Sequence, residues 1–242
     1  MCFKTASLLI LYGLTLFCSP LYGQDSTASK RVNYPSKASA IGAFIASPVG
    51  NFGSTDINNG GFAAPGWGVV FDSKTRVKNG LSYVFHSTYS WMDIDQEAMS
   101  KEFSDYLGLK AEVDGGQHQP FLSTIGLNYD FYFTKRLKLG INGQAGVLYN
   151  SFRPFTLKVY DANNVLFYED IVQYESAFAF AYSFGADLTL QLIKNVLGLK
   201  VSADYSAGNL DTYLISKNLP PTKSVSKLEM LNLGLALEFY TP

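Results

Sequence analysis

The amino-acid sequence predicts an all-β protein, a transmembrane antiparallel up-and-down β-barrel of about eight strands. Three observations predict it. The chain begins with a short apolar segment typical of secreted proteins. Apolar and polar residues then alternate with a period of two, as in strands with one face toward an apolar phase. Aromatic residues are frequent (15%) and charged residues scarce (16%), yet after residue 23 no apolar run approaches the ~20 residues of a membrane helix.

Residues 1–23 are interpreted as a secretory signal peptide. Lys4 supplies the positive charge, an apolar run covers residues 6–17, and Gly23 precedes the expected cleavage point. The alternative is lipidation at Cys18, but the bulky Phe17 before it argues against that modification. Both cysteines lie in this segment, so the secreted protein would have no disulfide, no thiolate nucleophile and no Cys-ligated metal.

The remaining chain is divided into two parts. Residues 24–38 are polar and contain a proline, which is typical of an unstructured periplasmic leader. Residues 39–242 are predicted to form the barrel as a single domain. The formal net charge of −1 gives no indication of the positive charge that nucleic-acid binding requires.

Alternation is clearest in residues 121–133, where an almost wholly apolar face from Phe121 to Phe133 alternates with a polar or small face. A helix would mix the two sets around its circumference. Similar alternation predicts strands near 40–47, 66–72, 81–91, 137–150, 177–192, 197–206 and 231–239.

The connections between these strands differ in length. The predicted short turns are 73–79, 134–136 and 193–196, and the predicted long links are 48–60, 92–118, 153–175 and 208–226. Short periplasmic turns and long external loops are typical of barrels in the outer membrane of Gram-negative bacteria, with both termini in the periplasm.

Two of the long links contain further predicted structure. Link 92–118 is acidic and is expected to include a short helix around Gln96–Leu107. Residues 155–168 are expected to form a hairpin that turns at Asp161–Asn164.

Aromatic residues are expected to form two belts at the membrane interfaces. The belt at the short-turn end comprises Phe71, Phe131, Phe133, Phe239 and Tyr240. The belt at the long-loop end comprises Tyr89, Trp91, Phe121, Tyr149, Phe152 and Phe178. A soluble β-sandwich is the alternative, but the signal peptide, the strand length and the loop asymmetry count against it.

The inward face supplies the candidate site residues, which are polar. They are Asn128, Asp130, Lys138, Asn142, Gln144, Asp187, Lys200, Asp204 and Glu238. Hairpin pairing should bring Asp187 near Lys200 and Asp130 near Lys138. Because eight strands leave room only for side chains, the set is interpreted as a structural plug of ion pairs and hydrogen bonds. A proton or ion path is the alternative.

Catalytic and metal-binding patterns are weak. His86 has inward parity, and no acidic residue is placed opposite it by the sequence, so a lipid-directed esterase is not expected. Asp93, Asp95 and Glu97 have calcium-loop spacing, but the loop lacks the sixth-position glycine, and Ser104 replaces the closing glutamate. The sequence predicts neither a cofactor nor a metal.

The segment from Ile41 to Phe52, IGAFIASPVGNF, resembles the opening strand of the outer-membrane β-barrel family common in Bacteroidetes, often labelled porin-like or OmpA-like. The resemblance covers residues 39–242, and the Gly23–Gln24 junction also fits that phylum. The family often ends on an aromatic residue, whereas this chain ends Tyr240-Thr241-Pro242. The resemblance implies fold and location, and it carries over no functional residues.

The sequence therefore favours a non-enzymatic outer-membrane barrel with an envelope or surface-interaction role. The alternatives are a narrow channel or a carrier for small or hydrophobic solutes and, more remotely, a lipid-modifying enzyme. Expected partners are outer-membrane lipid and the barrel-assembly machinery. Loops 92–118 and 153–175 are the candidate surfaces for an extracellular partner.

Overall fold

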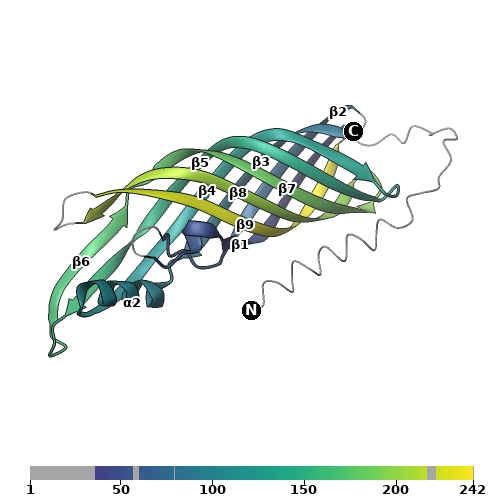
Figure 1. The fold of residues 1–242 in the computed structure, drawn as a ribbon. Coiled ribbons are helices and arrows are strands. Elements are labelled where there is room, and N and C mark those ends of the chain that lie inside the picture. The colour runs from purple at the N-terminus through teal and green to yellow at the C-terminus, as the bar shows by residue number, and fades with distance from the viewer. Residues whose placement is uncertain (1–35, 57–59, 79, 217–221, 242) are drawn as a thin grey trace. The chain divides into compact units, whose positions relative to one another are not determined.

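The computed structural model describes residues 36–56, 60–78, 80–216 and 222–241. Most of these residues form one antiparallel barrel (Figure 1). The predicted signal peptide and nearly all of the predicted leader lie outside the described residues. The first strand begins at Lys37, before the expected boundary at residue 39, because Lys37 and Ala38 already pair with strands on both sides.

The chain forms nine strands, one short 3-10 helix and one α-helix within the described residues. In chain order they are β1 (Lys37–Pro48), η1 (Gly50–Gly53), β2 (Gly66–Lys78), β3 (Leu81–Asp93), α2 (Gln96–Leu107), β4 (Lys110–Tyr132), β5 (Leu137–Tyr160), β6 (Leu166–Tyr174), β7 (Ala177–Ile193), β8 (Leu197–Ser216) and β9 (Thr222–Thr241).

Eight of these strands close into a ring. Consecutive ring strands pair antiparallel in the order β1, β2, β3, β4, β5, β7, β8, β9, and β9 pairs back with β1. This confirms the predicted eight-stranded up-and-down barrel. Closure pairs every ring strand on both sides, so the barrel wall has no free edge.

The ring continues further at both ends than the sequence predicted. Residues 73–78 belong to β2 and not to a turn. Link 153–175 and the described part of link 208–226 are largely strand, and link 92–118 consists mainly of α2 and the outer part of β4. β4 and β5 stay paired from Lys110↔Tyr160 down to Tyr132↔Lys138. In these outer segments both faces of a strand meet water or other protein, so apolar and polar residues no longer alternate. The alternation pattern therefore did not predict the strand pairing there.

The extension beyond the barrel contains α2 and the β5–β6 hairpin (Figure 1). The predicted helix at Gln96–Leu107 is confirmed. The Asp95 carboxylate accepts a hydrogen bond from the Ala98 backbone N–H at 3.0 Å and caps its start. Gly108, at φ +66°, ends it in the left-handed conformation that glycine adopts without strain. No helix among the described residues is long and apolar enough to cross a membrane.

The hairpin predicted within residues 155–168 is also confirmed. β5 pairs with β6 from Phe155↔Val172 to Tyr160↔Leu166. At the turn, the Asp161 carboxylate accepts hydrogen bonds from the backbone N–H groups of Asn163 and Val165 at 2.8 and 2.9 Å. β6 lies outside the eight-stranded ring and pairs with β8 through Val172–Tyr174.

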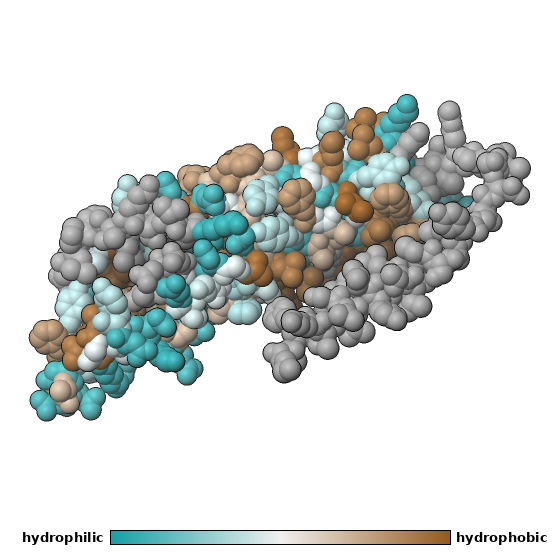
Figure 2. All heavy atoms as spheres, in the orientation of Figure 1, coloured by the Kyte–Doolittle hydropathy of each residue, from teal (hydrophilic) through white to brown (hydrophobic). Residues whose placement is uncertain are grey.

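The alternation of the wall residues is confirmed. Ile141 and Leu188 face outward, at 50% and 45% exposure, whereas their neighbours Asn142 and Asp187 are only 8% and 1% exposed. Outward Leu, Ile, Val and aromatic side chains form an apolar band around the barrel, and polar residues dominate the extension (Figure 2). Such a band matches the hydrocarbon layer of a membrane.

Two aromatic residues assigned to the belts point inward, which corrects the prediction. Phe152 is buried against His118, and Tyr240 donates a hydrogen bond from its hydroxyl to Glu238 Oε2 at 2.6 Å. Each has the parity of inward neighbours, Leu148 in one case and Glu238 in the other. Whether a side chain points into or out of the barrel depends on its odd or even position along the strand, and not on its aromatic character.

Candidate functional site

The barrel interior is the candidate site, and alternate residues of β2 to β5 and β7 to β9 provide its polar side chains. All nine residues predicted to face the lumen are buried there. They are Asn128, Asp130, Lys138, Asn142, Gln144, Asp187, Lys200, Asp204 and Glu238. They gather because inward positions of neighbouring strands stand side by side in the ladder.

Ion pairs begin near the short-turn end of the lumen. Lys138 Nζ lies 3.0 Å from Glu238 Oε1 and 3.6 Å from Asp130 Oδ2. Lys74 Nζ lies 3.9 Å from Asp130 Oδ1 and 2.8 Å from Asp187 Oδ2. Each lysine therefore contacts two carboxylates that are themselves removed from water, which offsets the cost of burying its charge.

The same pattern continues toward the middle of the barrel. Lys200 Nζ lies 3.9 Å from Asp187 Oδ2 and 2.5 Å from Asp72 Oδ2. The other oxygen of Asp72 lies 2.6 Å from His86 Nδ1. The ion-pair chain, defined as Glu238, Lys138, Asp130, Lys74, Asp187, Lys200, Asp72 and His86, thus alternates in charge from Glu238 to Asp72 and ends at His86.

Two members of this chain, Asp72 and Lys74, were missed by the sequence analysis. The nearest cation to Asp187 is Lys74, and Lys200 is farther away. Pairing inferred from the sequence identifies only residues that face each other within one hairpin. Lys74 lies on β2 and Asp187 on β7, which are not neighbours in the ring. The available signal was parity, because Asp72, at the end of the predicted strand, and Lys74, beyond it, continue the inward series of Val70.

The expectation that no acidic residue lies opposite His86 is wrong. Asp72 is its direct cross-strand partner between β2 and β3. The imidazole is 4% exposed and faces the lumen, so it does not reach the outer wall. A histidine–aspartate pair is present, but it is enclosed by the barrel.

Neutral side chains complete the polar half of the lumen. Lys74 donates to Asn128 Oδ1 at 3.1 Å, and Asn128 Nδ2 donates to Asp130 Oδ1 at 2.7 Å. Thr124 donates to Gln144 Oε1 at 2.7 Å, and Gln144 Nε2 donates to Asn142 Oδ1 at 2.9 Å. These bonds satisfy polar groups that would be costly to bury alone.

Asp204 lies beside the ion-pair chain, against the backbone of Gly185. A Cβ at position 185 would come within 1.8 Å of Asp204 Oδ1, so only glycine leaves room for this carboxylate. Among the described residues, Asp204 has no ion pair.

The half of the lumen nearer the extension is filled mainly by apolar side chains. We call this cluster the apolar plug. It consists of Phe44, Ala46, Phe52, Ala63, Val70, Met92, Leu122, Leu148, Ala181, Leu210, Leu228 and Met230. Phe52 comes from η1, in the link between β1 and β2, and is 2% exposed. That link therefore folds inward and packs into the barrel mouth.

His118 lies above the plug, beyond Phe121 and outside the apolar band. Its Nε2 lies 3.1 Å from the Gly61 carbonyl oxygen, and its Nδ1 lies 3.3 Å from Asn150 Nδ2. The rings of Phe52 and Phe152 pack edge-on against it. Burial lowers the pKa of His118 to about 4, although its bond to Gly61 partly opposes this effect. A neutral imidazole therefore joins the inward-folded link to β4 and β5.

Two cavities between described residues of the lumen are small. A cavity of about 30 Å³ at the short-turn end is lined by Lys74, Asp130 and Lys138, among others. A second, of about 10 Å³, lies beside His86, Asp204 and Asn232. The first has room for about two water molecules, and the second for one at most.

Two acidic residues of the segment 92–118, Asp93 and Asp95, have structural partners. Asp93 accepts a hydrogen bond from Gln117 Nε2 at 2.8 Å, and Asp95 caps α2. Ser104 donates to the Ser100 carbonyl and accepts from the Ala111 backbone N–H, which holds α2 on β4. Within the described ranges, no three His, Cys, Asp or Glu side chains are grouped as metal ligands would be.

Comparisons with known proteins give similarity at the level of solved structures. No family model and no curated protein matches the chain. A major outer membrane protein from Thermus thermophilus is similar at 12% identity and a TM-score of 0.45, covering 84% of this chain and 99% of that chain. OprG from Pseudomonas aeruginosa is similar at 11% identity and a TM-score of 0.43, covering 86% and 98%. Ail of Yersinia pestis, solved with the heparin analogue sucrose octasulfate, is similar at 13% identity and a TM-score of 0.44, covering 86% and 100%.

Proposed function

We propose that this protein is a non-conducting, non-enzymatic barrel of a Gram-negative outer membrane, of the type common in Bacteroidetes. Its role at the envelope or cell surface is carried by the extension of α2, β6 and the outer parts of β4 and β5. The proposal places the short turns and both termini in the periplasm.

The filled lumen is the observation that carries the proposal. The ion-pair chain occupies one half and the apolar plug occupies the other, and the cavities of about 30 and 10 Å³ hold too little water for a hydrated ion. A channel needs a continuous wet path, and a solute carrier needs a cavity larger than these. The polar residues are therefore assigned a structural role.

An enzymatic role is disfavoured by the position of the histidine–aspartate pair. His86 and Asp72 lie inside the wall, 4% and 3% exposed, where neither a lipid nor a dissolved substrate reaches them.

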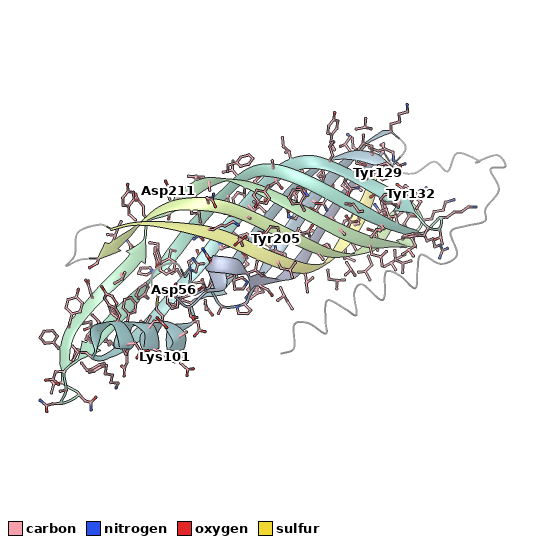
Figure 3. The ribbon with its side chains drawn as sticks, viewed as in Figure 1. Asp56, Lys101, Tyr129, Tyr132, Tyr205 and Asp211 are labelled. Atoms are coloured by element: carbon pink, nitrogen blue, oxygen red, sulfur yellow. The ribbon has the colours of Figure 1, made fainter. Side chains whose placement is uncertain are left out.

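The extension offers a surface that is not committed to the barrel. α2 covers one face of the outer β4–β6 sheet, burying Met99 against Val113 and Phe155, and its residues Glu97 and Asp105 are exposed. Lys101 projects from α2 at this end (Figure 3). Tyr106 and, on β6, Phe167 are 73% and 75% exposed, and exposed aromatic side chains are typical contact residues.

Planar-bilayer recording of the folded full chain tests the proposal. We expect no ion current for the wild type, and no current for Leu148→Ala, because a cavity the size of the lost side chain does not connect the two ends. Steady single-channel steps from the wild type would instead support the channel. A change in lipid A composition that is lost with His86→Ala would support the enzyme.

A further inference from the structure

The barrel end with the short turns has a rim of positive charge. The basic rim is defined as Lys37, Arg76, Lys78, Lys135, Arg136 and Lys194. In the described residues of this end (36–37, 75–78, 80–81, 132–137, 192–197 and 239–241), no aspartate or glutamate occurs. The charges lie at the start of β1 and at each of the three turns, so they surround the ring.

The carboxylates closest to this end along the strands are not available to the rim. Asp130 and Glu238 face the lumen, buried at 6% and 1% exposure, and contact Lys138. Within the described part of the chain, five rim residues have no ion pair, namely Lys37, Lys78, Lys135, Arg136 and Lys194, and all five are exposed. Arg76 packs over the ring of Tyr132, which lies at this end (Figure 3). Within the described residues, no carboxylate is therefore paired with Lys37, Lys78, Lys135, Arg136 or Lys194, so these five cations are open to an anionic partner.

Exposed apolar side chains stand next to these cations. Val77 lies between Arg76 and Lys78, and Ile193 precedes Lys194, with 51% and 54% of their surfaces exposed. Phe133, 47% exposed, lies two positions before Lys135. A soluble anionic partner would leave these groups in water, whereas a membrane interface takes the apolar groups into hydrocarbon and the cations to the phosphate level.

We propose that the basic rim binds anionic phospholipid headgroups of the leaflet at this end of the barrel. The proposal rests on the membrane location argued above and adds a lipid class to it. The opposite end provides an internal contrast, since residues 93–114 contain seven acidic and two basic residues. Each lysine or arginine near the membrane surface is expected to raise the preference for an anionic lipid over an uncharged one about fivefold.

Tryptophan quenching by brominated lipids tests the proposal on the full folded chain. Trp67→Phe and Trp91→Phe remove the native tryptophans near the extension, and Phe133→Trp places one beside Lys135. The protein is reconstituted into phosphatidylcholine vesicles that contain either brominated phosphatidylglycerol or brominated phosphatidylcholine. We expect a fivefold or greater preference for phosphatidylglycerol at position 133, lost at 1 M salt, where the Debye length is about 3 Å.

Two controls separate the rim from general effects. Replacing Lys135, Arg136 and Lys194 with glutamine should bring the preference at position 133 close to one. The native tryptophans, in the chain without the Phe133→Trp change, should report no preference for phosphatidylglycerol at the acidic end.

The outcomes distinguish this proposal from the proposed function. Equal quenching by both lipids at position 133 overturns the basic rim as a lipid site and leaves the membrane barrel intact. Absence of quenching by either lipid overturns membrane insertion itself. Co-sedimentation of the protein with peptidoglycan, lost in the triple glutamine variant and accompanied by equal quenching, would assign the rim to that polymer and contradict the proposal.

Discussion

The two halves of the lumen exclude solvent by different physical means. Near the short turns, the ion-pair chain fills the barrel with charges that neutralise one another. Near the extension, the apolar plug fills it with side chains that need no partner. The difference predicts different responses to mutation. The charged half should lose stability when one member of an ion pair is removed, and the apolar half when a side chain is shortened.

The largest effect is expected from Asp187→Leu. Asp187 lies 2.8 Å from Lys74 and 3.9 Å from Lys200, so its removal leaves two buried ammonium groups short of a partner. Breaking a buried pair typically costs about 3–5 kcal/mol. The measurement is the free energy of unfolding in urea, with the barrel folded in lipid vesicles.

A double variant shows whether the loss comes from charge. Asp187→Leu combined with Lys74→Met removes both members of the closest pair and should recover part of the lost stability. If the double variant is as unstable as the sum of the two single variants, the charges are not coupled and the description of the polar half is wrong.

A smaller effect is expected from Leu148→Ala in the apolar plug. Leu148 is 1% exposed, and truncation of such a side chain leaves a cavity that costs about 2–4 kcal/mol. Leu188→Ala on the outer wall is the matched control, since lipid can fill the space, and it should cost less. Equal losses of unfolding free energy for the two variants would argue against a packed plug.

The smallest effect is a pH dependence that comes from His118. Its pKa falls from the ordinary 6.5 to about 4 in the folded protein, so the unfolded chain binds a proton first as the pH drops. Stability contributed by the neutral imidazole is present above pH 6.5 and is lost as the pH falls toward 4. Between pH 7 and pH 5 this amounts to about 2 kcal/mol of unfolding free energy.

His118→Gln isolates that contribution, because glutamine does not titrate. The difference in unfolding free energy between wild type and variant should shrink as the pH falls from 7 to 5. A difference that stays constant with pH would mean that His118 titrates normally and is not enclosed.

The sequence was sufficient for the wall of the barrel and for part of its content. Period-two alternation identified all eight ring strands and placed residues such as Asn142 and Asp187 on the inner side. It missed Lys74, because the strand was ended where its outward side chains cease to be strongly apolar. It also missed the direct pairing of His86 with Asp72, although both have inward parity.

The inward fold of the link between β1 and β2 had no comparable signal. Phe52 belongs to the plug through contacts with residues far along the chain, and no local repeat marks it. The same holds for the upper parts of β4 and β5, where α2 and solvent replace lipid. Periodicity reports only the environment on each face of a strand, so it fails where that environment changes.

The most direct test of the account asks which side of the wall touches lipid. The measurement is the nuclear Overhauser contact between acyl-chain protons and individual side chains of the protein in lipid nanodiscs. The account predicts contacts from the methyl groups of Ile141 and Leu188 and none from the side-chain amide of Asn142. Acyl-chain contacts at the Asn142 amide, with none at the Ile141 and Leu188 methyl groups, would contradict it.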